Sequence, residues 1–157
     1  ARVGFGPRVR HVMVATDFGE PSQRARSFAC GLARMFDARV TLLHVVPWLS
    51  ASVARVLPAE AEVVAQAKLA LKTELELAKQ EATGVESLLV EGDARERILA
   101  AAREMNVDLV AMGTHARRGV SRLFLGSVAE AVVRASEIPV LTISATPEEA
   151  AVAPLGV

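Results

Sequence analysis

The sequence predicts an α/β fold, a three-layer α/β/α sandwich built on a five-stranded parallel sheet. Five short apolar runs alternate along the chain with segments whose apolar residues recur at helical spacing. The runs are apolar almost throughout rather than at every second residue, which is typical of strands buried on both faces. Regular alternation of such strands with helices predicts a parallel sheet covered by helices on both sides.

The first half of the chain predicts two strands and two helices. The run VRHVMVAT and the run RVTLLHVV have the β-branched, apolar character of strands. Ser22 is the expected N-cap of the first helix, because a hydroxyl at that place can accept a hydrogen bond from an amide of the first turn. The expected elements are a strand over 9–16, a helix from Ser22 to about Phe36, a strand over 39–46 and a helix from Pro58 to about Thr83.

The second half continues the alternation. Gly84 is expected to stop the long helix, and Asp93 with Glu96 predicts a capping box at the start of the next one. The expected elements are a strand over 85–91, a helix over 94–105, a strand over 107–112, a helix over 127–136 and a strand over 140–144.

Length and composition indicate one domain in a reducing compartment. The 157 residues suit a single domain, with a core over 8–144 and a loose tail over 145–157. The 18 basic and 18 acidic residues balance, so no general attraction to nucleic acid or membranes is indicated. A single cysteine excludes an internal disulfide framework, and we expect Cys30 to be a small core residue. With no secretory signal and no run of membrane-spanning length, we expect a cytoplasmic protein.

The loop after the fourth predicted strand suggests a phosphate site. The stretch LVAMGTHARRGVSRLFLGSVAE holds three glycines, three arginines and a histidine, and no acidic residue before Glu130. Glycines let backbone amides approach an anion, and a helix that begins at Ser127 would present amides without intrahelical partners. The missing side chain of Gly113 is expected to leave room for a ligand. The alternative is that Gly126 and Ser127 form an ordinary cap and the arginines a solvated surface.

The predicted sheet directs attention to the carboxyl ends of its strands, where ligands of open α/β sheets bind. Neither GxxxxGK[ST] nor a GxGxxG after the first strand is present, which disfavours a P-loop and a classical dinucleotide site. Ser127, His115 and Asp17 could converge as a hydrolase triad, but the GxSxG elbow is missing. His11 and His44 lie within apolar strands and are expected to be core or strand-end residues rather than metal ligands.

Three stretches of the chain resemble the universal stress protein family. They are VATDF, LLHVV and AMGTHARRGVSRLFLGSVAEAVVRASEIPVLTI, and the resemblance covers about residues 8–144. The family's nucleotide-binding form carries a glycine, two residues, a second glycine, nine residues, and then glycine with Ser or Thr. That spacing is intact from Gly113 to Ser127, with Ala116 in place of the second glycine. The resemblance implies a Rossmann-like sheet of strand order 3-2-1-4-5.

The resemblance also implies a ligand, an adenine nucleotide such as ATP, ADP or AMP lying across the sheet. Apart from the resemblance, the Asp17 carboxylate is a candidate partner for a Mg²⁺ held by bound phosphates. By the resemblance, Asp17 and Val45 would contact the adenine, Ala15 and Thr16 would line the pocket, and Met112 and Gly113 would lie along the ribose. The phosphates would be held by Ala116, Gly126, Ser127 and Val128, with His115 nearby, and the charge of Arg117 independently suggests that it balances theirs.

The resemblance further implies a stress-response sensor or regulator that forms a homodimer through the edge strand 140–144. No residue stands out as a base poised on a water molecule, so catalysis beyond slow ATP hydrolysis is not predicted. Ala116 supports an alternative, a family member that binds no nucleotide and acts through protein contacts. A nucleotide hydrolase on the same type of sheet is a further alternative.

Overall fold

The computed structural model describes residues 8–48, 59–114 and 126–144. Strands and helices alternate as the sequence predicts. The strands are β1 (His11–Ala15), β2 (Arg39–Val46), β3 (Val85–Glu91), β4 (Leu109–Thr114) and β5 (Val140–Ser144), and the helices are α1 (Glu20–Phe36), α3 (Ala59–Glu81), α4 (Ala94–Glu104) and α5 (Ser127–Ala135).

The five strands form one parallel sheet of order β3-β2-β1-β4-β5. This confirms the predicted fold class and strand order. The chain moves outward from β1 to β2 and β3, then returns to the other side of β1 for β4 and β5. The strand order therefore reverses beside β1, between β1 and β4, where open α/β sheets bind their ligands.

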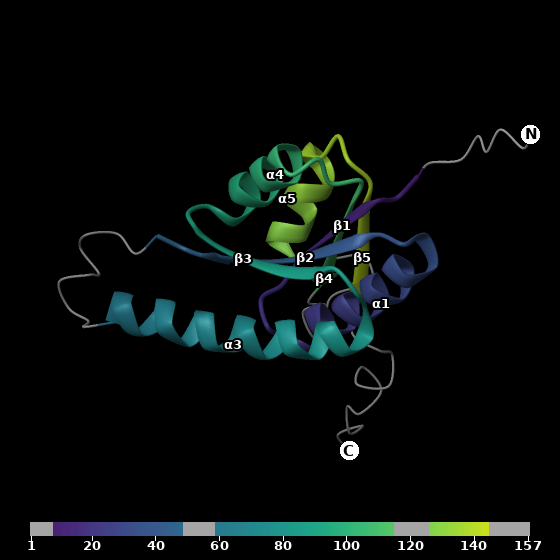
Figure 1. Cartoon of the computed structure of the whole chain (residues 1–157). Helices are drawn as coiled ribbons and strands as arrows, with labels where there is room; N and C mark the ends of the chain where they lie inside the picture. The colour runs from purple at the N-terminus through teal and green to yellow at the C-terminus, as the bar shows by residue number, and fades with distance from the viewer. Residues whose placement is uncertain (1–7, 49–58, 115–125, 145–157) are drawn as a thin grey trace, which may run out of the picture.

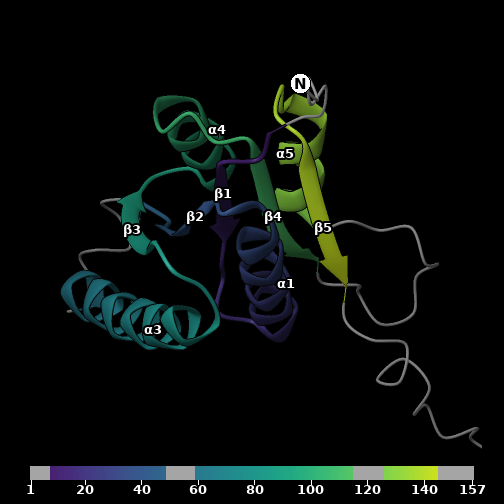
Figure 2. The same cartoon turned by 45° about the vertical axis from the view of Figure 1, so that its right-hand side comes forward.

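Helices cover both faces of the sheet. Figure 1 shows α1 and α3 below the sheet and α4 and α5 above it, and Figure 2 shows the same layers after a turn of the molecule. Successive side chains of β1 point to opposite faces, as the period of a strand requires. Val12 and Val14 join the core beneath α1 and α3, whereas Met13 and Ala15 join the core beneath α4 and α5. No helix among the described residues is long and apolar enough to cross a bilayer.

Several predicted boundaries differ from the observed ones by one or two residues, and a specific contact accompanies two of these differences. The fourth strand begins at Leu109 rather than at residue 107, because Asp108 belongs to the turn before it. The Asp108 carboxylate accepts hydrogen bonds from the amides of Arg10 (2.8 Å) and His11 (3.0 Å) and so joins this turn to the start of β1. The first helix begins at Glu20 with Gly19 as N-cap, so Ser22 lies inside the helix and is not its cap.

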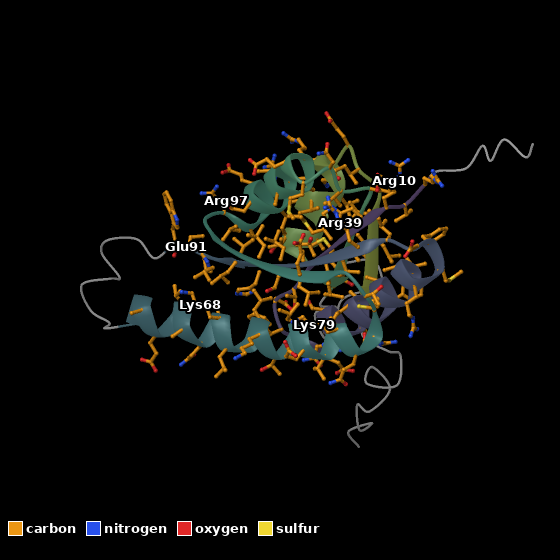
Figure 3. The ribbon with its side chains drawn as sticks, in the orientation of Figure 1. Arg10, Arg39, Lys68, Lys79, Glu91 and Arg97 are labelled. Carbon is orange, nitrogen blue, oxygen red and sulfur yellow. The ribbon has the colours of Figure 1, made fainter. Side chains whose placement is uncertain are left out.

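The turn between β3 and α4 has the predicted cap. The Asp93 carboxylate accepts the amide of Glu96 at 2.9 Å, as an N-cap should. Gly92 has a φ of +139°, which L side chains rarely adopt, and Arg97 folds over it to donate to the Glu91 carbonyl at 2.7 Å. Figure 3 shows Glu91 and Arg97 together at the end of the sheet opposite Arg10.

Two titratable side chains are buried and electrically neutral, as expected for core residues. His11 is 1% exposed, and its ring nitrogens contact the Thr41 hydroxyl at 2.8 Å and the Met105 carbonyl at 3.1 Å. Burial lowers the pKa of His11, so the neutral imidazole is favoured. Burial raises the pKa of the Cys30 thiol to about 11, which keeps it protonated and unreactive.

Candidate functional site

A cavity of about 620 Å³ opens at the carboxyl ends of β1, β2 and β4, beside the first turns of α4 and α5. It therefore lies at the point where the strand order reverses. Its walls combine apolar side chains from the strands and α4 with polar groups of the turn after β1 and the start of α5. The lining residues are Ala15, Thr16, Asp17, Ser22, Leu43, His44, Val45, Ala94, Ile98, Met112, Gly113, Gly126, Ser127, Val128, Ala129 and Glu130.

The structure brings together most of the site residues predicted from the sequence. Three of the stretches that meet at the cavity are the ends of β1, β2 and β4, which lie at the same edge of the parallel sheet, and the fourth is the start of α5. His115, Ala116 and Arg117 lie outside the described residues. The predicted residues that line the cavity are Ala15, Thr16, Asp17, Val45, Met112, Gly113, Gly126, Ser127 and Val128.

The turn after β1 is held by its own side chains. The Asp17 carboxylate accepts the Ser22 hydroxyl at 2.6 Å and the Gly19 amide at 2.9 Å through the same oxygen, Oδ1. Ser22 thus fixes Asp17 instead of capping the helix. A carboxylate held by two donors is a rigid acceptor on the cavity wall, and it is poorly placed to act as a mobile base.

His44 supports the same turn from β2. Its Nδ1 donates to the Thr16 carbonyl at 2.7 Å, and its ring stacks on Phe18 with centroids 4.2 Å apart. Phe18 has a φ of +66°, an uncommon conformation for a bulky residue, so this stacking contact helps to hold a strained turn in place. Sequence reasoning placed His44 at a strand end but did not assign it to the site.

Gly113 serves a different purpose from the one predicted. A Cβ built on it would lie 2.4 Å from both the Pro21 carbonyl carbon and the Ser22 amide nitrogen. The side of Gly113 on which a Cβ would lie is therefore filled by the first turn of α1, while its backbone still lines the cavity. This close approach lets α1 pack against β4 and brings Ser22 to Asp17.

The start of α5 contributes the amide end of a helix to the cavity. The first hydrogen bond of this helix runs from the Glu130 amide to the Gly126 carbonyl at 2.8 Å. The amides of Ser127, Val128 and Ala129 precede that bond, so none of them has a partner within the helix. Together with the helix dipole, they favour a negative charge at this end of the cavity. Glu130 also lines the cavity, but its carboxylate is paired with Arg134 at 2.9 Å.

Sequence reasoning found Ala15, Val45 and Met112 but missed the rest of the apolar side of the cavity. Leu43 of β2 and Ala94 and Ile98 of α4 contribute to this wall. Their apolar character is visible in the sequence, but only the strand order places α4 above the ends of β1 and β2. Taken together, the cavity can hold a flat apolar group against this wall and an anion against the amides of α5. Among the described residues, no group of three His, Cys, Asp or Glu side chains could hold a metal ion.

Comparisons with known proteins agree with this fold. The model of the universal stress protein family matches residues 8–144. The universal stress protein MJ0531 of Methanocaldococcus jannaschii is 31% identical over 150 residues, which cover 89% of this chain and 85% of the relative.

Two solved structures share the fold. A universal stress protein solved in complex with cAMP matches with a TM-score of 0.63 at 26% identity, over 87% of this chain and 97% of that one. A universal stress protein from Archaeoglobus fulgidus in complex with dAMP matches with a TM-score of 0.67 at 22% identity, over 88% of this chain and 99% of that one. At this level of identity, the match supports the fold alone. From the family match and the sequence relatives we conclude that this chain belongs to the universal stress protein family.

Proposed function

We propose that this protein binds an adenine nucleotide, ATP or the related ADP or AMP, and acts as a stress-response sensor or regulator. One observation carries the proposal. A single cavity joins an apolar wall that suits a flat base to the amide end of a helix that suits phosphate. A relative of the same fold at 26% identity was solved with cAMP, which supports an adenine nucleotide as the ligand class.

The nucleotide would lie across the sheet between the two ends of the cavity. The base would contact Ala15 and Val45, with the Asp17 turn at its edge, and the ribose would lie along Met112 and Gly113. The phosphates would meet the amides of α5, with His115, Ala116 and Arg117 as further predicted contacts. Asp17 and Glu130 are the carboxylates of the cavity, and either could meet a Mg²⁺ that arrives with ATP.

Calorimetry with ATP, ADP and AMP tests the proposal, with GTP as the matched control. We expect ATP to bind at least about tenfold more tightly than GTP, because an apolar wall would leave the additional polar groups of guanine without hydrogen-bond partners. The supernatant of the boiled protein, separated by chromatography, would show any nucleotide that copurifies. No affinity for any adenine nucleotide and no copurified nucleotide would instead favour a family member that acts through protein contacts.

We further propose a homodimer that forms through β5. Among the described residues β5 ends the sheet and pairs with β4 alone, so its other edge is available for a strand. The Val110 amide donates to the Pro139 carbonyl, and β5 residues bond to β4 alternately in a parallel ladder. The amides of Leu141 and Ile143 therefore face β4, whereas the Thr142 amide faces the free edge.

Thr142→Pro should convert the dimer to monomer in light scattering. The proline removes the outward N–H and keeps the ladder with β4, since proline is tolerated on the solvent side of an edge strand. Thr142→Ala keeps that N–H and is the control, which we expect to remain dimeric. A dimer that survives Thr142→Pro would place the interface elsewhere. Leu141 is less suitable for this test because it packs against the core beneath α1.

A further inference from the structure

A buried cluster of charged side chains lies behind the cavity, between α1 and α3. Arg26 of α1 is 7% exposed and Glu74 of α3 is 5% exposed. Glu81 of α3 completes the cluster, with its Oε1 3.3 Å from Nη2 of Arg26. Charged side chains are seldom this deep, because leaving water is strongly unfavourable for a charge whose hydrogen bonds are not replaced.

Arg26 and Glu74 lack hydrogen-bond partners despite their burial. Nε and Nη1 of Arg26 have none, and neither carboxyl oxygen of Glu74 has one. The two groups require different hydrogen-bond partners. The guanidinium can only donate and needs acceptors, whereas the ionised carboxylate can only accept and needs donors. A bound cation would suit Glu74 alone, and a bound anion would suit Arg26 alone. Water can accept from one and donate to the other, so a bridging water would satisfy both groups.

Glu74 also faces the turn that lines the cavity. The side chains that act on its carboxyl group are the Thr16 hydroxyl, the Arg26 guanidinium and the Asp17 carboxylate. The Thr16 hydroxyl accepts the Phe18 amide at 3.0 Å, so its own proton is left for another acceptor. This hydroxyl acts on the Glu74 carboxyl group, although neither Glu74 oxygen is hydrogen-bonded, and Thr16 therefore connects the buried cluster to the cavity wall.

We propose that Glu74 is a positioning residue for the cavity. With Arg26 and bridging water, it accepts the Thr16 hydroxyl proton and holds the turn from Thr16 to Gly19 in the form that a nucleotide base would meet. The proposal rests on the proposed function for the identity of the ligand. The coupling of Glu74 to the turn does not depend on that ligand.

The charge state of Glu74 makes the coupling measurable. Burial raises the pKa of Glu74 above its ordinary value of 4.5, with Asp17 acting in the same direction and Thr16 and Arg26 opposing it. A carboxyl group with a raised folded pKa contributes stability that is present below its unfolded pKa and is lost as pH rises through its folded pKa. The stability of Glu74→Gln relative to the wild type should therefore increase as pH rises above 4.5.

Amide NMR of the nucleotide-free protein tests the coupling directly. We expect the amides of Thr16 and Phe18 to shift with a common midpoint above pH 4.5, and we expect that step to vanish in Glu74→Gln. Glu76→Gln, an exposed change on the same helix, is the control and should leave the step in place. Absence of the step in the wild type, or its persistence in Glu74→Gln, would overturn the proposal.

Calorimetry with ATP tests the consequence for the ligand. Glu74→Gln, which can still accept from Thr16, should bind ATP within about threefold of the wild type. Glu74→Leu, shown to be folded by circular dichroism, should bind at least about tenfold more weakly because nothing accepts from Thr16. Wild-type affinity in a folded Glu74→Leu variant would contradict the positioning role. If the wild type binds no ATP, the proposed function fails, and the NMR titration still decides whether Glu74 holds the turn.

Discussion

The double variant Gly126→Val, Ser127→Ala is expected to bind ATP roughly 100-fold more weakly than the wild type, a loss of about 2.7 kcal/mol. The valine side chain would lie over the first amides of α5, where the phosphates are proposed to bind, and the alanine removes the Ser127 hydroxyl. Gly126 has a φ of −56° and a ψ of 154°, which valine adopts without strain. A loss of affinity would therefore report blocked access to the amides rather than a distorted backbone at the cap. Calorimetry on the folded variant gives the answer.

Val133→Ala is the matched control for this variant. Val133 lies on the same helix, is 40% exposed and does not line the cavity. We expect its affinity for ATP to stay within about twofold of the wild type, because surface changes of this kind are usually close to neutral. Equal ATP affinity in the double variant and in Val133→Ala would show that the start of α5 does not hold the phosphates.

Gly113→Ala is expected to destabilise the protein by about 3 kcal/mol or more. The added Cβ would lie 2.4 Å from backbone atoms of Pro21 and Ser22, and backbone cannot swing aside as the end of a side chain can. Relief requires α1 to move away from β4, which would also pull Ser22 from Asp17 and disturb the cavity. Urea denaturation measures the change in the free energy of unfolding.

Gly31→Ala should have the opposite effect on the free energy of unfolding. Gly31 lies in α1, the helix that packs against Gly113. A Cβ at Gly31 meets nothing within 4 Å, and alanine is favoured over glycine in a helix by about 0.5–1 kcal/mol. We therefore expect Gly31→Ala to raise the free energy of unfolding while Gly113→Ala lowers it. A Gly113→Ala variant as stable as the wild type would contradict the close packing of α1 on β4.

The order of the elements could be predicted from the sequence because it depends on local patterns. Continuous apolar runs such as RVTLLHVV allow few alternatives to a buried strand, and the cap at Asp93 is a short-range signal. The boundary of α1 was predicted two residues late because Ser22 is a good cap in isolation. Pro21 also suits the first turn of a helix, and the bond from Ser22 to Asp17 becomes visible only in three dimensions.

Contacts between distant segments could not be predicted from local patterns. The role of Gly113 depends on α1, which the sequence alone does not place against β4. The buried charges of Arg26 and Glu74 look like ordinary solvated positions of two helices until those helices are packed together. One signal was available, since Glu74 lies at helical spacing between Leu71 and Ala78, which are both buried.

A crystal structure of the protein grown with ATP tests the central claim most directly. The account predicts phosphate oxygens within hydrogen-bond distance of the amides of Ser127, Val128 and Ala129, with the adenine against Ala15 and Val45. It would be contradicted by a structure in which the protein's own side chains fill this cavity and bond those amides, while ATP is absent or bound elsewhere.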